Sequence, residues 1–554
     1  MLAKKIFISA ILILLLGMLF FSHLLFDQLR NKKEAKFLID QSIEILKLQT
    51  KHTYSGFPRK WNIKTNEYVD IDTISSPRFI QYWNLSYLTY GSIALNYMTN
   101  VIDAFYTSSM NQDIPWYYDF NQKGAKKDFP LPAFVIGDTL MGLGHVYEMS
   151  GNEIYKERAE NLGKRSIDLF LDPDTNLIRD QINFDLSPKY DTKSEMGRET
   201  LLIDSWLYLF DILGDRYYLD NADKAITALW NLRNPQTNLI SEVYEASTSA
   251  QENQTHAGTI GEFSETIYYA WFLTKDNKYL SILKTLMDTQ IKFFWNEQLN
   301  RFIDTVNTEN GSVIDFGYHA VRLEPNIYSL IRLYSITGDK QLLDLAQKSI
   351  DTYRKHGFIN GLPVVELDKN NKPVSATTQT GAIYPYIKSA AMLSVFRGEK
   401  YLDDAIKVSH RSVELLKRKY GYVSALDLLT GQDVSTDYDL GGSMWLQDEG
   451  FAVLASILIF YPQADTMLPS KTSIISIAEN SIIRGFKPDI KTNSFTGYIS
   501  NPQTGSHVCI NLPSSYEISF ASSSSRFIKY GDCQFFLNSI PGNIEFTVKY
   551  KYEI

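Results

Sequence analysis

Apolar helical segments alternate with amphipathic ones along most of the chain, and a short polar tag separates the two members of each pair. The tags lie around Asn152, Asp215, Asp276, Asp339 and Glu399, at intervals of about 60 residues. An apolar run precedes each tag, a glycine or polar residue interrupts it, and an amphipathic run follows. The pattern predicts a helix, a tight turn and a second helix, repeated along the chain.

The paired helices predict a closed ring. Their first members are expected to begin near Trp83, Ala133, Glu199, Glu262, Glu324, Gly381 and Trp445. Long segments with Asn-Gly and Gly-Ser turns connect one pair to the next. We therefore predict a mainly α fold, an (α/α)6 or (α/α)7 barrel over residues 34–465, with the apolar helices inside. An open superhelix is the alternative, but its helix pairs usually repeat at shorter intervals.

The N-terminus carries an apolar run over residues 6–26, which is long enough to span a bilayer core. Lys4 and Lys5 precede it and no small-residue cleavage site follows, so we predict an uncleaved membrane anchor at residues 1–33. Basic residues also follow the run, from Arg30 onward, and the charge pattern leaves the orientation open. We expect a single-pass membrane protein with an extracytoplasmic body, and a cytosolic body is the alternative.

Residues 466–554 differ in character from the helical region. They alternate Ile, Val, Phe and Tyr with polar residues and turns, which predicts a small β-rich domain that packs on the barrel or binds glycan. The only two cysteines of the chain, Cys509 and Cys533, lie here. A disulfide outside the cytosol and two separate buried thiols both fit this pair.

The composition narrows the classes of ligand. Hydrophobic residues make up 44% and charged residues 21% of the chain, as in a folded protein. The net charge is −8 and no basic stripe occurs, which argues against a nucleic-acid partner. Aromatic residues are abundant. They pack the cores of proteins, and their faces also bind sugars in clefts. The composition therefore adds a weak indication of a carbohydrate ligand.

Carboxylates gather at the expected starts of the inner helices. They are Asp138, Glu199, Glu262, Glu265, Glu324, Asp448 and Glu449. One acid in a first helical turn is explained by its effect on the helix dipole. Several acids in otherwise apolar helices are costly unless water or a partner solvates them. Parallel inner helices begin at one mouth of the ring, so we predict that these acids share a solvated pocket there.

Such a pocket suits the cleavage of glycosidic bonds, which needs one carboxyl to donate a proton and a second to activate water or attack the sugar. The remaining candidates for substrate binding are two loop histidines and two aromatic residues, His256, His319, Trp445 and Tyr384. Structural roles are the alternative for each of them. An acidic mouth would suit Ca²⁺, although no liganding loop is recognisable in the sequence.

The phrases "GRETLLIDSWLYLFDILGDRYYLDNADKA" and "LEPNIYSLIRLYSITGDKQLLDLAQKS" resemble helix pairs of (α/α)-barrel sugar enzymes, with the closest local likeness to class I α-mannosidases (glycoside hydrolase family 47). Glu199 and Thr200 match a Glu-Thr pair that opens an inner helix of that family, which implies a general acid. The resemblance places Glu262 in the pocket wall. Glu324 stands near a pocket carboxylate of the family, with Pro and Glu transposed, and Glu449 matches the acid of its last inner helix.

We therefore expect a membrane-anchored carbohydrate-active enzyme, a glycoside hydrolase acting on an oligo- or polysaccharide. Glu199 is the expected acid, and Glu324 or Glu449 the expected base. The other candidates, Asp138, Glu262, Glu265 and Asp448 among them, are expected to bind substrate. Similar helix pairs occur in sugar 2-epimerases, unsaturated glucuronyl hydrolases and uronate C5-epimerases. An epimerase or lyase in polysaccharide assembly or export, with Tyr and His as proton carriers, and a non-catalytic glycan-binding protein are the alternatives.

Overall fold

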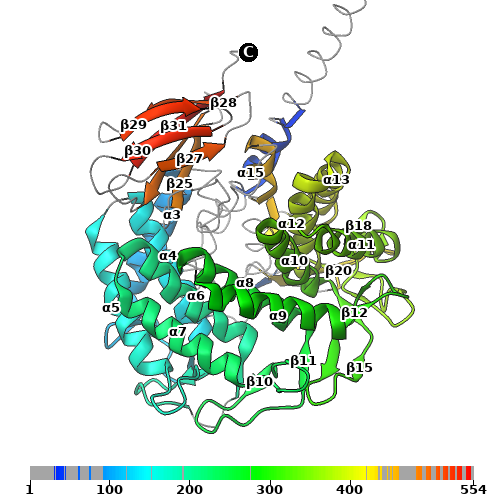
Figure 1. Ribbon diagram of the computed structural model, residues 1–554, viewed down its shortest axis with the longest axis horizontal. Helices are drawn as coiled ribbons and strands as arrows, with labels where there is room; N and C mark the ends of the chain where they lie inside the picture. The colour runs from blue at the N-terminus through cyan, green and yellow to red at the C-terminus, as the bar shows by residue number, and fades with distance from the viewer. Residues whose placement is uncertain are drawn as a thin grey trace, which may run out of the picture.

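A computed structural model of the chain describes most of the helical region and the strands that follow it (Figure 1). The described residues are 30–31, 33–42, 44, 60–62, 74–75, 92–119, 122–150, 152–189, 193–274, 276–418, 421–434, 437–439, 446, 450–451, 453–460 and seven strands between 482 and 550. No helix in this part of the chain combines the length and apolar character that a membrane span requires. The predicted anchor lies outside the described residues and stays a prediction.

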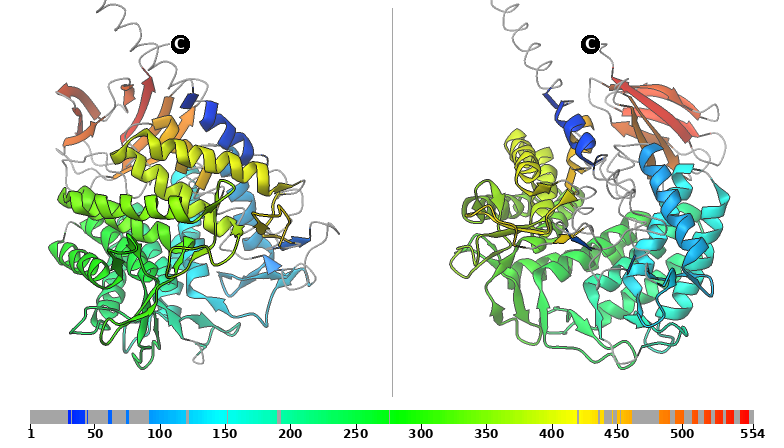
Figure 2. Two further views of the ribbon diagram at one scale, coloured as in Figure 1. Left: turned by 90° about the vertical axis from the view of Figure 1, so that its right-hand side faces the viewer. Right: turned by 180° about the vertical axis from the view of Figure 1, so that it is seen from behind.

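Five helix hairpins follow one another around a ring, and each first helix contacts the first helix of the next pair (Figures 1 and 2). These inner helices are α4 (Ala133–Ser150), α6 (Met196–Leu213), α8 (Ala257–Thr274), α10 (Leu323–Thr337) and α12 (Thr380–Arg397), followed by the shorter α15 (Val453–Phe460). The outer helices are α3 (Ser92–Ser108), α5 (Glu153–Phe170), α7 (Arg216–Asn231), α9 (Asn277–Phe294), α11 (Lys340–His356) and α13 (Glu399–Leu416).

The recurring tags are the turns between the inner and outer helices, as predicted. Asn152, Asp215, Asp276 and Asp339 each precede an outer helix and accept a hydrogen bond from a backbone amide of its first turn. This contact satisfies one of the amides that a helix N-terminus leaves without a partner. The tags therefore lie at the end of the barrel opposite the starts of the inner helices.

A tyrosine two or three residues after several tags connects neighbouring outer helices. The hydroxyl of Tyr279 on α9 donates to Asp223 on α7 at 2.6 Å, and the hydroxyl of Tyr401 on α13 donates to Asp351 on α11 at 3.1 Å. Since this tyrosine recurs with the tag, the sequence repeat specifies the spacing of the outer wall as well as its turns.

A ring of small antiparallel sheets surrounds the other mouth. The strand before each inner helix pairs with a strand from the loop after the following outer helix. The pairs are β2 (Ile74–Ser75) with β5 (Tyr118–Asp119), β7 (Leu131–Pro132) with β8 (Gln181–Ile182), β9 (Ser194–Glu195) with β10 (Val243–Tyr244), β11 (Gln254–His256) with β14 (Thr305–Asn307), β16 (Tyr318–His319) with β19 (Glu366–Leu367), β20 (Thr377–Gln379) with β23 (Ala425–Asp427), and β1 (Lys60–Asn62) with β24 (Asp437–Asp439).

The last of these pairings closes the ring, because β1 and β24 come from opposite ends of the barrel segment. A helical segment within residues 30–44 packs beside α13 in the same way, with Glu34 next to His410 and Glu44 in an ion pair with Lys417 at 2.6 Å. The N-terminal residues thus supply the outer helix that would follow α13. The seven pairings between successive repeats fit the seven-pair form of the predicted barrel.

The C-terminal strands form two antiparallel sheets beside the α3 and α4 side of the barrel (Figures 1 and 2). One sheet has the order β25–β26–β31–β28 and the other the order β27–β30–β29. Their bounds are β25 (Ile482–Asp489), β26 (Ser494–Ser500), β27 (His507–Asn511), β28 (Tyr516–Ala521), β29 (Ser525–Tyr530), β30 (Cys533–Asn538) and β31 (Ile544–Tyr550). Cys509 pairs with Phe535 in the ladder and Cys533 with Asn511, so the two cysteines lie on neighbouring strands.

Glycines allow the inner helices to approach one another closely. A Cβ on Gly137 of α4 would lie 2.7 Å from the Leu201 carbonyl oxygen on α6, and a Cβ on Gly261 of α8 would lie 2.6 Å from that of Pro325 on α10. Contacts this short require the absence of a side chain. The helix spacing therefore depends on these positions.

We predict that Gly137→Ala lowers the free energy of unfolding by about 1–3 kcal/mol, because the added methyl group overpacks the α4–α6 contact. Gly381→Ala on α12 is the matched control, since a Cβ there meets no atom within 4 Å. The control is expected to be neutral or to gain up to ~1 kcal/mol from helix propensity. Denaturant unfolding of both variants measures the difference, and equal effects would contradict the packing argument.

Candidate active site

Residues at corresponding repeat positions of the inner helices form three tiers. Each tier lies deeper in the barrel than the one before it, counted from the mouth where these helices begin. Corresponding residues are about 60 positions apart in the sequence, as the tags are. The first tier contains Asp138, Leu201 and Glu262, and Glu324 and Tyr384 stand one residue before the corresponding positions of α10 and α12. The second contains Met141, Asp204, Glu265, Tyr328 and Lys388, and the third contains His145, Tyr208, Tyr269, Arg332 and Met392.

These tiers lie on the faces of the inner helices that point away from the outer wall. On α6, Trp206 marks the opposite face, because its indole N–H donates to Ser166 on α5 at 2.8 Å. Water reaches Glu262 in the first tier, Glu265 in the second and also Glu324, whereas every third-tier residue is buried. Carboxyl groups therefore line a part of the barrel interior that solvent enters from the mouth.

Glu262 lies against the neighbouring helix at a place that only glycine can leave open. A Cβ on Gly197 of α6 would lie 1.8 Å from Oε2 of Glu262. Burial raises the pKa of Glu262 to about 7; Arg322 opposes the rise, and the negative charges of Glu324 and Glu242 add to it. At neutral pH a large fraction of this carboxyl therefore carries a proton that it can donate.

Glu324 forms an ion pair with a cation from the next inner helix. Nζ of Lys388 on α12 lies 2.6 Å from Oε1 of Glu324, and the ammonium is largely buried. Lys388 also lies 5.2 Å from the centre of the Tyr328 ring, and Arg332 donates a hydrogen bond to the Tyr328 hydroxyl. A carboxylate fixed in this way differs chemically from Glu262, as a proton donor and a base must differ.

The third tier joins the inner helices through aromatic contacts below the carboxyl groups. The ring of His145 on α4 stacks on Tyr208 of α6 at 4.5 Å between centres. The hydroxyl of Tyr269 on α8 donates to Asp211 of α6 at 3.1 Å, and the guanidinium of Arg332 lies 5.1 Å from the ring centre of Tyr268. These packed groups form a rigid support for the tiers above.

His256 belongs to a charged cluster at the rim between α8 and α10. Its Nε2 lies 2.6 Å from Glu242 and its Nδ1 2.9 Å from Asp304. Burial alone would lower the pKa of His256, but the hydrogen bonds to Asp304 and Glu242 raise it to about 9. Both ring nitrogens are thus engaged by carboxylates. The second predicted histidine, His319, lies 3.7 Å from Glu366 at the rim.

Glu199 lies on a different face of α6 from the three tiers. Its repeat equivalents are Ile136 on α4 and Ile260 on α8, which are core residues. Glu199 is fully buried, and neither carboxyl oxygen has a hydrogen-bond partner among the described residues. Burial raises its pKa well above the usual value, and the nearby charges of Asp180 and Glu195 add to the effect. Its predicted role as the acid stays a prediction.

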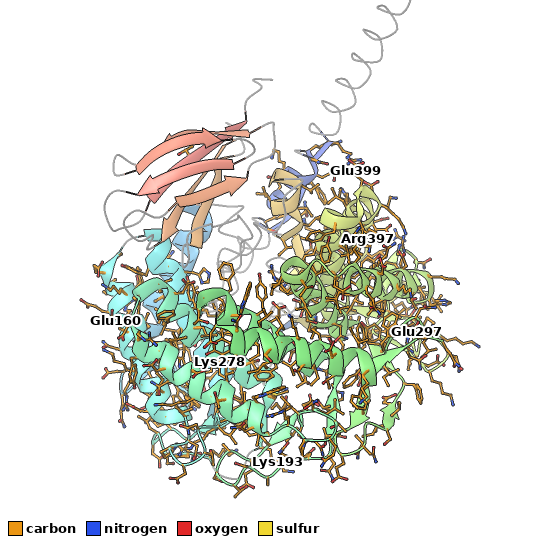
Figure 3. The ribbon with its side chains drawn as sticks, in the orientation of Figure 1. Glu160, Lys193, Lys278, Glu297, Arg397 and Glu399 are labelled. Carbon is orange, nitrogen blue, oxygen red and sulfur yellow. The ribbon has the colours of Figure 1, made fainter. Side chains whose placement is uncertain are left out.

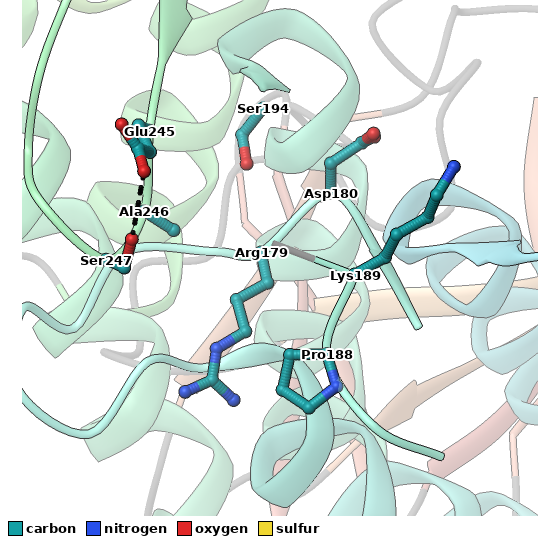
Figure 4. A pocket seen from close by; sticks show the side chains of 8 residues that line it. All are labelled: Arg179, Asp180, Pro188, Lys189, Ser194, Glu245, Ala246 and Ser247. Atoms are coloured by element: carbon teal, nitrogen blue, oxygen red, sulfur yellow. Dashed lines mark hydrogen bonds between the residues drawn. The ribbon is translucent and has the colours of Figure 1, made fainter. Parts of the chain in front are cut away.

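A small polar cavity lies beside the neighbours of Glu199 (Figure 4). Asp180 and Ser194 line it together with Arg179 and Lys189, and its volume is about 20 Å³. That volume holds about one water molecule and excludes a sugar. The cavity is therefore too small to serve as the substrate pocket.

Glu262, Glu265 and Asp138 fall in the upper two tiers by their repeat positions, and Glu324 is near enough to Glu262 to raise its pKa. Tyr384 stands one residue before its first-tier position, and the predicted roles of these residues stay predictions. The remaining candidates, Trp445, Asp448 and Glu449, lie outside the described residues, and their roles stay predictions.

Sequence reasoning missed the cations of this site. Lys388 and Arg332 belong to no recognisable sequence motif. Arg322 contacts Glu242, but the two residues come from different repeats. Aligning the inner helices at the interval of the tags would have placed Lys388 in the same column as Asp204 and Glu265, and Arg332 in the same column as His145.

In the described part of the chain, no group of three or more His, Cys, Asp or Glu side chains is arranged to hold a metal ion.

Solved structures with this fold include sugar enzymes of two kinds. An α-1,2-mannosidase from Trichoderma reesei superposes with a TM-score of 0.60 at 12% identity, over 81% of this chain and 98% of that one. The cellobiose 2-epimerase from Spirochaeta thermophila DSM 6192 gives 0.50 at 15% identity, over 60% and 86%. The sequence matches no protein-family model and no curated protein. The likeness confirms the α/α-barrel fold inferred from the resemblance to (α/α)-barrel carbohydrate-active enzymes.

We predict that Glu199→Gln stabilises the protein at alkaline pH and has little effect in acid. The folded-state pKa of Glu199 is raised, so its contribution is fully present below the unfolded-state pKa, near 4.5, and is lost as pH rises above it. Glutamine removes this loss because it does not ionise. Melting temperatures of both proteins at pH 4.5 and pH 8 provide the measurement. A variant that is less stable at pH 8 would show that the carboxylate is charged and solvated in the fold.

Proposed function

We propose that the chain is a carbohydrate-active enzyme, a glycoside hydrolase whose carboxyl pair is Glu262 and Glu324. The observation that carries the proposal is the contrast between the two acids. Burial favours the protonated form of Glu262, whereas Lys388 stabilises the charged form of Glu324. Fold likeness to a mannosidase supports the substrate class without specifying the sugar.

In this mechanism Glu262 donates its proton to the glycosidic oxygen as the bond from that oxygen to the anomeric carbon breaks. Glu324 then acts at the anomeric carbon in one of two ways. It takes a proton from the attacking water, which inverts the configuration, or it attacks the carbon itself and forms an ester that water later cleaves. The anomeric configuration of the first product, read by NMR, distinguishes the two routes.

Glu199 and Glu449 remain alternative members of the pair. Glu449 lies outside the described residues, and Glu199 is on the face of α6 that packs away from the tiers. The variants Glu199→Gln and Glu262→Gln therefore separate the two assignments of the acid.

A sugar epimerase is the second candidate, favoured by His145. This histidine lies in the third tier, and its Nδ1 is 2.7 Å from the Met141 carbonyl oxygen, which can only accept a hydrogen bond. The neutral ring then carries its lone pair on Nε2 and can act as a base. Incorporation of deuterium from solvent into a sugar of unchanged chain length would favour this reading over hydrolysis.

We also propose that residues 6–26 anchor the enzyme in a membrane with its body outside the cytoplasm, on the strength of the apolar run alone.

We predict that Glu262→Gln and Glu324→Gln each lower the rate of hydrolysis of a responsive glycan by about 100-fold or more. Glu297→Gln is the matched control, because Glu297 is exposed at the periphery of the barrel (Figure 3). The assay measures newly formed reducing ends across a panel of oligosaccharides, with melting temperatures to confirm folding. Full activity in Glu262→Gln would remove the assignment, and saturable binding without any product would indicate a non-catalytic glycan-binding protein.

Because Glu262 must be protonated to act as the acid, we expect activity to fall as pH rises through about 7. The pH dependence of kcat/KM measures this limb in the free enzyme. A rate that stays constant from pH 6 to pH 9 would contradict the role of Glu262 as proton donor.

A further inference from the structure

Arg322 occupies a position between fixed negative charges at the rim of the site. It ends the short 3-10 helix η3 (Ala320–Arg322) that leads into α10. One guanidinium nitrogen lies 3.9 Å from Oε1 of Glu242, and another lies 3.9 Å from Oδ1 of Asp304. The same two carboxylates hold His256 on their other side.

The four side chains balance one another in charge. Glu242 and Asp304 are anions, Arg322 is a cation, and the two carboxylates keep His256 protonated at neutral pH. Glu242 and Asp304 therefore hold Arg322 by contacts that do not depend on the protonation state of Glu262. A charge fixed in this way is typical of a preorganised site.

The path of the Arg322 side chain crosses α8 at a glycine. A Cβ on Gly258 would lie 2.5 Å from Cδ of Arg322 and 3.3 Å from one of its terminal nitrogens. Gly258 and Glu262 are four residues apart, so they lie on the same face of α8, one turn from each other. The guanidinium thus reaches the neighbourhood of Glu262 only because residue 258 has no side chain.

We propose that Arg322 is a positioning residue for Glu262, anchored across α8 by the cluster of Glu242, His256 and Asp304. The proposal rests on the proposed function, in which Glu262 is the proton donor. Arg322 limits how strongly burial holds the proton on that carboxyl, and so keeps the acid able to release it near neutral pH.

The charged groups that act on Glu262 come from four elements. Arg322 on η3 and Arg198 on α6 lower its pKa, whereas Glu324 on α10 and Glu242 before β10 raise it. Arg322 is the strongest of the four, so its removal leaves the acidic neighbours dominant. Glu262 then keeps its proton to a higher pH.

The test compares Arg322→Met, which keeps the stem and removes the charge, with Arg322→Lys, which restores the charge. We expect Arg322→Met to move the alkaline limb of kcat/KM upward by up to about one pH unit and Arg322→Lys to return it toward the wild type. Arg216→Met on α7 is the matched control, because Arg216 is exposed and pairs only with the exposed Asp220 among the described residues. A lower rate with an unmoved limb would assign Arg322 a merely structural role and overturn the proposal.

A second variant displaces the guanidinium without removing it. Gly258→Ala places a methyl group in the path of Arg322, and we expect a shift of the limb in the same direction as for Arg322→Met. Gly381→Ala is the control for adding a methyl group to an inner helix. This variant keeps the proposal testable if Arg322→Met fails to fold, and an unshifted limb in a folded Gly258→Ala would count against it.

A readout that needs no activity separates this proposal from the proposed function. Carbodiimides react with protonated carboxyl groups, so mass spectrometry of labelled Glu262 across pH reports its protonation directly. We expect the labelling midpoint to rise in Arg322→Met. A raised midpoint in an enzyme that cleaves no glycan would leave the positioning intact and remove the hydrolase. Cleavage with an unchanged midpoint would remove the positioning alone.

Discussion

The architecture depends on the close parallel packing of neighbouring inner helices. Gly137, Gly261 and Gly197 provide the space for it, since a side chain at any of them would collide with the next helix. Helices packed in parallel begin at one mouth, and their repeat positions descend together from it. Polar groups that recur at the repeat interval therefore meet in the same tier, although they are far apart in the chain.

This arrangement separates structural and chemical functions along the barrel axis. The capped turns and the tyrosine contacts of Tyr279 and Tyr401 hold the outer wall at one end. The ring of small sheets frames the other end, where the carboxyl groups lie. The buried third tier gives that site a floor whose side chains are fixed by contacts with each other, and a site supported in this way keeps its acids in place at little reorganisation cost.

The chemistry proposed for the site follows from unequal environments of similar side chains. Glu262 is half-buried against Gly197 and its pKa is raised to about 7, whereas Glu324 is ion-paired with Lys388. Glu199 lies in a third environment, which differs from those of Glu262 and Glu324. It is fully buried, and neither of its carboxyl oxygens has a hydrogen-bond partner in the described part of the chain.

The sequence by itself determined the repeat, the caps and the ring. Asn152, Asp215, Asp276 and Asp339 cap helices because capping is local chemistry that a short stretch of sequence encodes. The sequence also indicated that acids lie at the starts of the inner helices, because the order of the helix pairs determines the direction of each helix. Only the tertiary structure decided which of those acids share the interior. Glu199 and Glu262 differ by two residues in their repeat positions, and on a helix two residues turn a side chain by about 200°, from the barrel interior toward the wall. The contacts of Glu324 with Lys388 and of Arg322 with Glu242 join different repeats, so no local pattern specifies them.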